Sequence, residues 1–252
     1  MSIISPQEAK FTVEVDVAVI GSGACGLCAG IAAKQAGANA LILERDSTAL
    51  GTTAMSTGLI PAAGTSFQSQ VGIDDAPEIF AADICKKSGY RSDEDLVLAL
   101  AKESAKTIEW LAIEQQVPLS LVDSFLYPGH TVKRMHGTPN RTGAELMGSL
   151  CNAAERAGVD ILTDATVTSL VADPDGRVHG LRCTRPDGST EDLACRALIL
   201  ACCGFAGNQA MVRQFIPEIE KGEFFGHPGN QGDAVIWGQA LGGTVADMSG
   251  YQ

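Results

Sequence analysis

The chain has 252 residues, of which 45% are hydrophobic and 19% are charged, and its formal net charge is −12. That length and apolar content exclude a disordered chain and suffice for a full hydrophobic core. The acidic balance argues against nucleic-acid binding, which depends on cationic contacts to phosphate. Because the sequence shows neither an apolar run of transmembrane length nor a secretory signal, we expect a cytoplasmic protein with one continuous α/β domain over residues 1–252.

The first predicted elements form a β-α-β unit over residues 13–44. Residues 13–20 are rich in β-branched and apolar side chains, as expected of a buried parallel strand. A helix of small residues follows and ends at Gly37, which suits a left-handed helix cap. The second strand, residues 39–44, ends in an acid, Glu44.

The turn of this unit carries the G-x-G-x-x-G pattern as Gly21, Gly23 and Gly26, with Glu44 closing the next strand. In a dinucleotide site the first glycine allows the tight turn, the second lets a pyrophosphate approach the backbone, and the third packs the helix on the sheet. Helix N–H groups then face the phosphate charge, and the acid accepts hydrogen bonds from a ribose diol. The alternative is a plain α/β turn that needs glycines. The complete context favours a dinucleotide site.

Eight cysteines occur in the chain, and reduced thiols are a better interpretation than a disulfide framework in a chain of this size. Cys25 and Cys28 have C-x-x-C spacing, but no second pair completes a four-thiolate zinc site, and no metal is predicted. A redox role for the pair stays open. The simpler interpretation is that both are small helix residues packed against the sheet.

The middle of the chain is predicted to be a helical insertion over residues 76–158. It follows an uncharged segment, residues 51–68, which is expected to lie against another part of the molecule or a ligand. Asp93 is a plausible N-cap of an amphipathic helix. A polar loop interrupts the helices, and we interpret it as solvated, because loops often carry such residues without chemistry. Its cationic side chains are those of His130, Lys133, Arg134, His136 and Arg141.

From residue 159 to residue 201 the pattern changes to strands separated by Asp-Pro-Asp-Gly and Pro-Asp-Gly turn signals. These strands are predicted to form an antiparallel β-meander, and the last apolar segment, residues 197–201, should rejoin the parallel sheet. Two further helical segments are expected at 207–216 and 234–243.

Five segments of this sequence resemble the fumarate reductase/succinate dehydrogenase flavoprotein family, which includes 3-ketosteroid dehydrogenase-like members. They occur in the family's order: ERDSTALGTT after the second strand, then GTTAMSTGLIPAAG, KRMHGTPNRTGAELMGSL, ALILACCGFAGN and GHPGNQGDAVIWGQALGGTVADMSGYQ. The resemblance covers the whole chain but only the N-terminal half of the family fold. It implies a Rossmann-like FAD-binding domain with a parallel central sheet, an additional antiparallel β-meander and a helical insertion, without the clamp domain.

The resemblance implies FAD as cofactor and assigns its contacts position by position. Glycines of the first turn would meet the pyrophosphate, Glu44 and Arg45 the adenosine ribose, Val167 the adenine and Asp233 the ribityl chain. The full set of implied FAD contacts is Gly21, Gly23, Cys25, Gly26, Glu44, Arg45, Gly51, Thr52, Thr53, Thr57, Gly58, Val167, Ala201, Cys202, Gly204 and Asp233.

The sequence departs from the family pattern at three points. Cys202 and Cys203 replace the Thr-Gly of a TGG turn, and Leu59 replaces the second glycine of a flavin-facing pair. The segment TTAMSTG has no histidine where some relatives attach flavin covalently, so noncovalent FAD is expected.

Catalytic residues are not assigned, because in this family they follow the position that Gln252 occupies here. Two interpretations therefore stay open. In the favoured one, the chain is the FAD-binding portion of a flavin-dependent oxidoreductase acting on CH–CH bonds next to a carbonyl or carboxylate. Catalysis would then need further sequence or a second polypeptide that supplies the clamp domain. The other way to cover the open face of the flavin is self-association of the chain across that face. In the alternative, the chain is a non-catalytic nucleotide-binding or interaction module. The substrate is open between dicarboxylates, steroids and others.

Overall fold

The computed structural model describes residues 1–251, and the chain divides into two compact units. One unit combines Met1–Met55 with Leu150–Gln252, of which Gln252, the last residue of the family-like motif, lies outside the described residues. The other unit is Ser56–Ser149. The predicted helical insertion, 76–158, falls mostly within this second unit.

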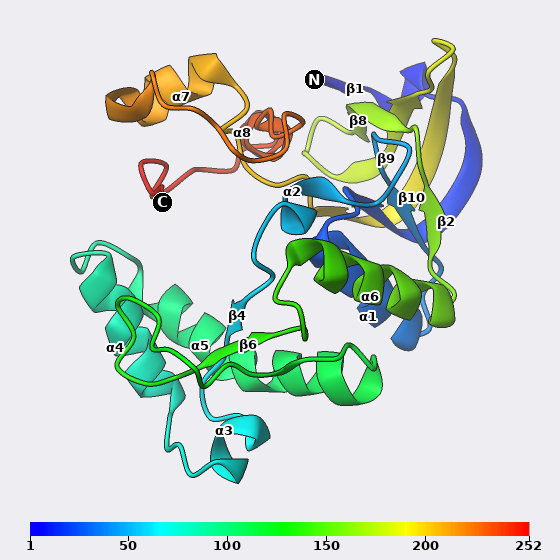
Figure 1. The fold of residues 1–252 in the computed structure, drawn as a ribbon. Coiled ribbons are helices and arrows are strands. Elements are labelled where there is room, and N and C mark those ends of the chain that lie inside the picture. The colour runs from blue at the N-terminus through cyan, green and yellow to red at the C-terminus, as the bar shows by residue number, and fades with distance from the viewer. Residues whose placement is uncertain (252) are drawn as a thin grey trace. The chain divides into compact units, whose positions relative to one another are not determined.

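The first unit is built on a seven-stranded sheet in the order β1-β8-β9-β10-β2-β3-β7 (Figure 1). Pairings β10–β2, β2–β3 and β3–β7 are parallel, whereas β8, β9 and β10 form the antiparallel meander. The mixed α/β fold class is confirmed, and the meander shares strand β10 with the parallel part. The strands are β1 (Ser2–Ile4), β2 (Phe11–Ile20), β3 (Ala40–Leu43), β7 (Asp160–Leu162), β8 (Thr166–Ala172), β9 (Val178–Thr184) and β10 (Thr190–Leu200).

Helix α1 (Ala24–Gln35) packs on the parallel strands through small residues. A Cβ added at Gly30 would lie 2.9 Å from Ile42 Cδ1 of β3 and 3.0 Å from Val159 Cγ1. A side chain at this position would therefore require Ile42 and Val159 to shift. The helix ends just before Gly37, whose φ of +82° confirms the predicted left-handed helix cap.

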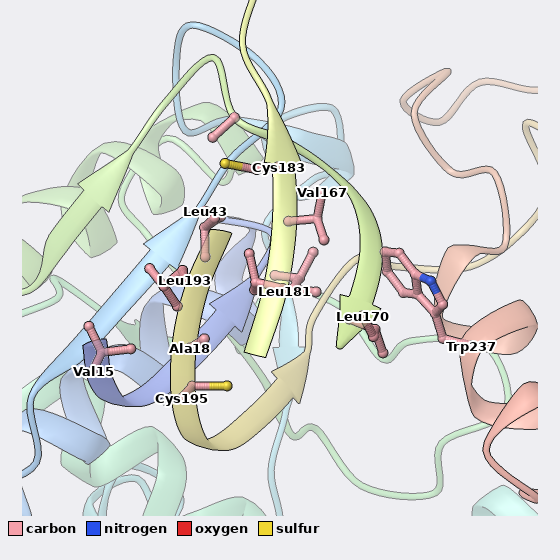
Figure 2. Close-up of a cluster of buried hydrophobic side chains, with 12 residues drawn as sticks. Val15, Ala18, Leu43, Val167, Leu170, Leu181, Cys183, Leu193, Cys195 and Trp237 are labelled. Atoms are coloured by element: carbon pink, nitrogen blue, oxygen red, sulfur yellow. The ribbon is translucent and has the colours of Figure 1, made fainter. Parts of the chain in front are cut away.

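The core of this unit is formed by strands β2, β3, β8, β9 and β10, together with Trp237 of helix α8 (Asp233–Ala240). Leu170, Leu181 and Leu193 are buried there, and Figure 2 shows the Trp237 ring beside Leu170. The Trp237 Nε1–H donates to the carbonyl of Ser2 over 3.3 Å. That bond fastens β1, a strand that sequence reasoning did not predict, beside β8.

The remaining helices of this unit are short. They are α2 (Gly51–Ala54), α7 (Gln209–Phe215) and two 3-10 turns, Pro6–Glu8 and Pro217–Ile219. Helix α6 (Gly143–Arg156) spans residues on both sides of the division between the units. Among the described residues, no helix has the length and apolarity that crossing a membrane requires.

The second unit combines helices with a small antiparallel sheet in the order β4-β6-β5. Its longest helix begins where predicted, because the Asp93 side chain accepts the Leu96 N–H over 3.0 Å. The helix continues into a π-helical turn at Trp110–Glu114. The elements of the unit are β4 (Ile60–Pro61), α3 (Ser66–Gln70), α4 (Pro77–Lys87), α5 (Glu94–Glu109), β5 (Ser120–Leu121) and β6 (Met135–Gly137).

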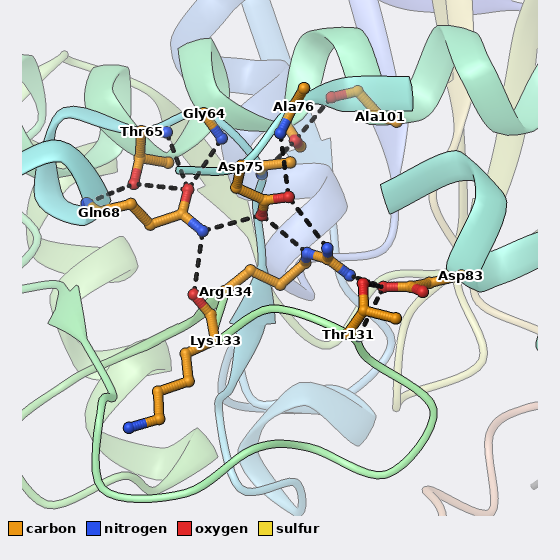
Figure 3. Close-up of polar contacts among 12 residues, drawn as sticks. Gly64, Thr65, Gln68, Asp75, Ala76, Asp83, Ala101, Thr131, Lys133 and Arg134 are labelled. Atoms are coloured by element: carbon orange, nitrogen blue, oxygen red, sulfur yellow. Dashed lines mark hydrogen bonds and ion pairs between the residues drawn. The ribbon is translucent and has the colours of Figure 1, made fainter. Parts of the chain in front are cut away.

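A buried ion network holds this second unit together (Figure 3). Arg134 is fully buried and donates from Nε and Nη2 to the two carboxylate oxygens of Asp75, at 2.9 and 3.0 Å. Its Nη1 donates to Asp83 at 2.5 Å. Gln68 completes the network, since its Nε2 donates to Asp75 and its Oε1 accepts the Gly64 N–H.

The interpretation of residues 130–141 as a solvated loop is therefore wrong in its centre. Arg134 and His136 are both fully buried, and His136 Nε2 lies 3.0 Å from Thr65 Oγ1. Burial lowers the pKa of His136 below its ordinary value, even though neighbouring backbone carbonyls oppose this effect. Only the ends of the segment, such as Arg141, are exposed as expected.

Candidate cofactor-binding site

A cavity of about 300 Å³ opens in the first unit where β2, β3 and β10 end. Carboxyl ends of parallel strands are the usual position of ligand sites in such sheets. The cavity brings together most of the predicted contacts, from segments far apart in sequence. Those lining it are Gly21, Gly23, Cys25, Glu44, Arg45, Gly51, Thr52, Thr53, Val167, Ala201, Cys202 and Asp233.

Two glycines of the G-x-G-x-x-G pattern, here called the fingerprint, are required by the packing of the protein itself. Gly21 has φ +100°, and a Cβ there would lie 2.6 Å from the carbonyl oxygen of Ala201. A Cβ at Gly26 would lie 1.8 Å from the Gly21 carbonyl oxygen. The first turn therefore closes against β10, and α1 approaches it closely, as the fingerprint predicts. Gly26 itself lies outside the cavity lining.

Gly23 is different, because packing within the protein does not require it. The nearest atom to a Cβ there would be Thr53 Oγ1, at an ordinary 3.6 Å. The residue is the N-cap of α1, whose first-turn amides have no helical acceptors. One of them, Ala24 N–H, donates to Thr53 Oγ1 over 3.3 Å. Open space before a positive helix end fits a pyrophosphate group.

Glu44 is held rigidly at the end of β3. Its Oε2 accepts from Ser22 twice, from N–H at 2.9 Å and from Oγ–H at 2.5 Å, and its Oε1 accepts the Asp46 N–H at 3.0 Å. A carboxylate offers about four acceptor positions, so Oε1 retains one. Although Glu44 is buried, it lines the cavity and is able to receive a ligand hydroxyl there.

Arg45 and Asp233, predicted to meet different parts of FAD, form an ion pair with Nη2–Oδ2 at 2.7 Å. Asp233 begins α8, where the positive end of the helix favours a carboxylate. Burial raises the pKa of the nearby Cys202 thiol to about 11, and the charge of Asp233 adds to the effect. Cys202 is therefore an inert wall of the cavity at neutral pH.

Sequence reasoning missed several lining residues: Ser22, Asp46, His227, Asn230 and Trp237. Thr52 Oγ1 accepts both the His227 N–H, at 3.2 Å, and Asn230 Nδ2–H, at 2.9 Å. His227 and Asn230 lie in the GHPGN part of a segment already noted as family-like, and that segment was the one signal by which the sequence could have pointed to them.

Besides Gly26, three predicted contacts lie outside the cavity lining. Thr57 and Gly58 belong to the second unit, where Gly58 has φ +64° and a Cβ on it would lie 2.8 Å from the Thr142 carbonyl oxygen. Gly204 lies after the end of β10, and a Cβ there would have no heavy atom within 4 Å. Cys203 lines the cavity instead, with φ +62°.

The sequence profile of the FAD binding domain matches residues 16–252. The chain belongs to the FAD binding domain family. This membership confirms FAD as the cofactor inferred from the sequence. The open space at Gly23, the helix terminus behind it and the spare acceptor of Glu44 fit the pyrophosphate and ribose of that group.

Individual relatives agree with the family resemblance inferred from the motifs. The chain is 30% identical to urocanate reductase from Eggerthella lenta, over 96% of this chain and 40% of that protein. It is 28% identical to NADH:fumarate oxidoreductase from Klebsiella pneumoniae, over 94% of this chain and 25% of that protein.

Among solved structures, 3-ketosteroid-Δ4-(5α)-dehydrogenase from Rhodococcus jostii RHA1, in complex with 4-androstene-3,17-dione, matches with a TM-score of 0.86 at 28% identity. That match covers 97% of this chain and 57% of the other. The chain thus spans a quarter to little more than half the length of the three proteins compared.

Proposed function

We propose that this chain is the FAD-binding portion of a flavin-dependent oxidoreductase that acts on a CH–CH bond next to a carbonyl or carboxylate. The observation that supports this most is the cavity at the ends of β2, β3 and β10, in a chain that belongs to the FAD binding domain family. The three similar proteins are named as an oxidoreductase, a reductase and a dehydrogenase. When bound, FAD would supply the capacity to accept or donate hydride.

Within this proposal, the residues of the chain bind and orient the cofactor. The first-turn amides of α1 and the open space at Gly23 receive the pyrophosphate. Glu44, fixed by Ser22 and Asp46, accepts the ribose hydroxyls at its spare position. The backbone of Val167, in β8, would meet the adenine. Arg45 and Asp233 neutralise each other's charge, and Arg45 would face the adenosine ribose while Asp233 would face the ribityl chain.

We further propose that FAD binds without a covalent bond. The histidine that lines the cavity, His227, already has both ring nitrogens in contacts with Asp46 and Gly229. Acid precipitation of the FAD-loaded protein is expected to leave all of the yellow colour in the supernatant. Colour that remains in the protein pellet would contradict noncovalent binding.

Catalysis is proposed to need polypeptide beyond this domain, either as further sequence, as a second chain or by self-association. The part that matches is 25% of one relative and 40% of the other, and this region supplies no acid/base set in its described residues. The eight free cysteines are consistent with a reducing compartment, and we place the protein in the cytoplasm.

The experiment is to load the purified chain with FAD and assay reduction of an artificial electron acceptor with succinate and with a 3-ketosteroid. FAD binding without turnover by the chain alone, and turnover in protein purified from its native source, would support the proposal. Substrate-dependent turnover by the isolated monomer would overturn the need for a partner. Absence of FAD binding would overturn the function as a whole.

A further inference from the structure

A chain of polar contacts connects His227, which sequence reasoning missed, to Glu44. His227 Nε2 lies 3.0 Å from Asp46 Oδ2, and the Asp46 N–H donates to Glu44 Oε1 over 3.0 Å. All three residues line the cavity. The imidazole is thus one residue removed from the carboxylate assigned to the ribose.

The hydrogen bonds determine where the proton of the ring lies. The Gly229 N–H donates to His227 Nδ1 over 3.0 Å. A backbone N–H can only donate, so Nδ1 is the acceptor and the neutral ring carries its proton on Nε2. Nε2–H therefore faces the Asp46 carboxylate, whose Oδ2 lies 3.0 Å from Nε2, and the contact is electrostatically favourable. The hydrogen bond at Nδ1 and the contact of Nε2 with Asp46 together orient the ring.

The backbone of His227 is anchored as well as its ring. Its N–H donates to Thr52 Oγ1, which also accepts from Asn230 Nδ2–H at 2.9 Å. The segment that carries His227 is thereby tied to α2, and its side chain reaches the loop after β3. Asp46 and Glu44 lie in the same loop after β3, and His227 contacts Asp46 from a distant segment of the chain.

We propose that His227 is a positioning residue for FAD binding: through Asp46 it keeps Glu44 in the orientation that receives the ribose. The inference deepens the proposed FAD site and rests on it. Without the imidazole, the Asp46 side chain loses its partner and the loop after β3 gains freedom. The Asp46 N–H then holds Glu44 Oε1 less firmly. FAD would then have to order the Glu44 carboxylate when it binds, and the entropy cost of that ordering would lower the affinity for FAD.

The chain offers a matched control in His179, whose Nε2 lies 3.0 Å from Asp173 Oδ2 in the same unit. The distance and the partner type are those of the His227–Asp46 pair. His179 and Asp173 do not line the cavity. A general effect of losing a histidine–carboxylate pair would appear at both places, and a positioning effect only at His227.

The test measures FAD affinity by flavin fluorescence for wild type, His227→Asn, His227→Gln and His179→Asn. Asparagine is too short to reach Asp46, and we expect about tenfold weaker binding, as for loss of a bond to a charged group. Glutamine carries an N–H near the position of Nε2 and is expected to restore most of the affinity. His179→Asn is expected to bind FAD like wild type.

A double-mutant cycle shows whether His227 acts through Glu44. In a Glu44→Gln background, the added substitution His227→Asn is expected to weaken FAD binding by less than about twofold, because the effects of coupled residues are not additive. The same loss in both backgrounds, or unchanged binding by His227→Asn, would overturn the inference while FAD binding by wild type stands. Failure of wild type to bind FAD would overturn the proposed function instead. If His227→Asn does not fold, Asp46→Ala removes the same bond and is measured in its place, with the same expectations.

Discussion

The two units use buried charge in opposite ways. In the second unit, Arg134 lies fully buried between Asp75 and Asp83, and every partner in that network belongs to the protein. In the first unit, Glu44 and Asp233 are also buried, but both line a cavity. Glu44 keeps an acceptor position that its protein donors do not fill.

This difference separates a structural site from a binding site better than residue type does. A saturated ion network stabilises or specifies a fold, and removing one member leaves an unpaired buried charge. An oriented carboxylate with spare capacity is prepared for a ligand. Substitutions in the second unit are therefore expected to affect unfolding, and substitutions around the cavity are expected to affect FAD.

The largest expected effect follows Arg134→Met, which leaves Asp75 and Asp83 buried without their cation. Breaking a buried pair from one side typically costs about 3–5 kcal/mol, and we expect the free energy of unfolding to fall by that amount. Chemical denaturation measures it. Arg196→Ala removes an exposed pair with Asp16 and should leave the midpoint unchanged. Equal effects of the two substitutions would refute the assigned role of the network.

Glu44→Ala is expected to weaken FAD binding roughly tenfold or more, since a charge-assisted hydrogen bond contributes about 1.5–3 kcal/mol. Equilibrium titration of FAD into both proteins measures the change. Thermal unfolding of the FAD-free variant serves as the control for folding. Equal affinities in wild type and variant would reject the ribose assignment.

The fingerprint glycines offer a comparison within one turn. Gly26→Ala places a Cβ 1.8 Å from the Gly21 carbonyl oxygen, and overpacking of this kind costs about 1–3 kcal/mol of unfolding free energy. Gly23→Ala meets only Thr53 Oγ1 at 3.6 Å, so the FAD-free protein should keep its stability while its affinity for FAD falls. The opposite pattern would show that the open space at Gly23 is not the pyrophosphate site.

Acid should weaken the second unit through Asp83. Burial acts to raise the pKa of this carboxyl, but hydrogen bonds from Thr131 and Arg134 outweigh burial and hold the pKa below its ordinary value. A lowered pKa contributes stability that is present above the unfolded-state value and is lost as the pH falls through the folded-state value. Unfolding free energy should thus drop below about pH 4, and less steeply in Asp83→Asn. Parallel pH profiles of the two proteins would exclude Asp83 as the cause.

The smallest effect is expected at the thiols. Cys25 is exposed and lines the cavity, so bound FAD should slow its alkylation, and metal analysis should find no zinc. Mass spectrometry after a short alkylation pulse measures the protection. Glu44→Ala, at an FAD concentration near the Kd of wild type, is the matched control and should show much less protection. Equal alkylation of wild type with and without FAD would contradict the position of Cys25.

Local patterns in the sequence predicted the β-α-β unit, the Asp93 cap and the meander. They did not predict β1, because Ser2–Ile4 is too short to show a period and acquires its partner, β8, from more than 160 residues away. The same limit explains the error at Arg134. Nothing local indicates that Asp75 and Asp83 converge on it.

The candidate site follows the same rule. The glycines and Glu44 are separated by fixed spacings in a motif with a known physical role, so the sequence pointed to them. Asp46 and His227 come together only in the folded chain, at opposite ends of the sequence, and no spacing connects them. Contacts made by folding, rather than by a motif, are what the sequence alone left out.

The most direct test of the FAD site is a crystal structure of this chain grown with FAD. It should show the pyrophosphate at the N-terminus of α1 beside Gly23 and a ribose hydroxyl within hydrogen-bond distance of Glu44 Oε1. The Arg134 network should be unchanged by the ligand. FAD bound elsewhere, or a ribose that makes no contact with Glu44, would contradict the account.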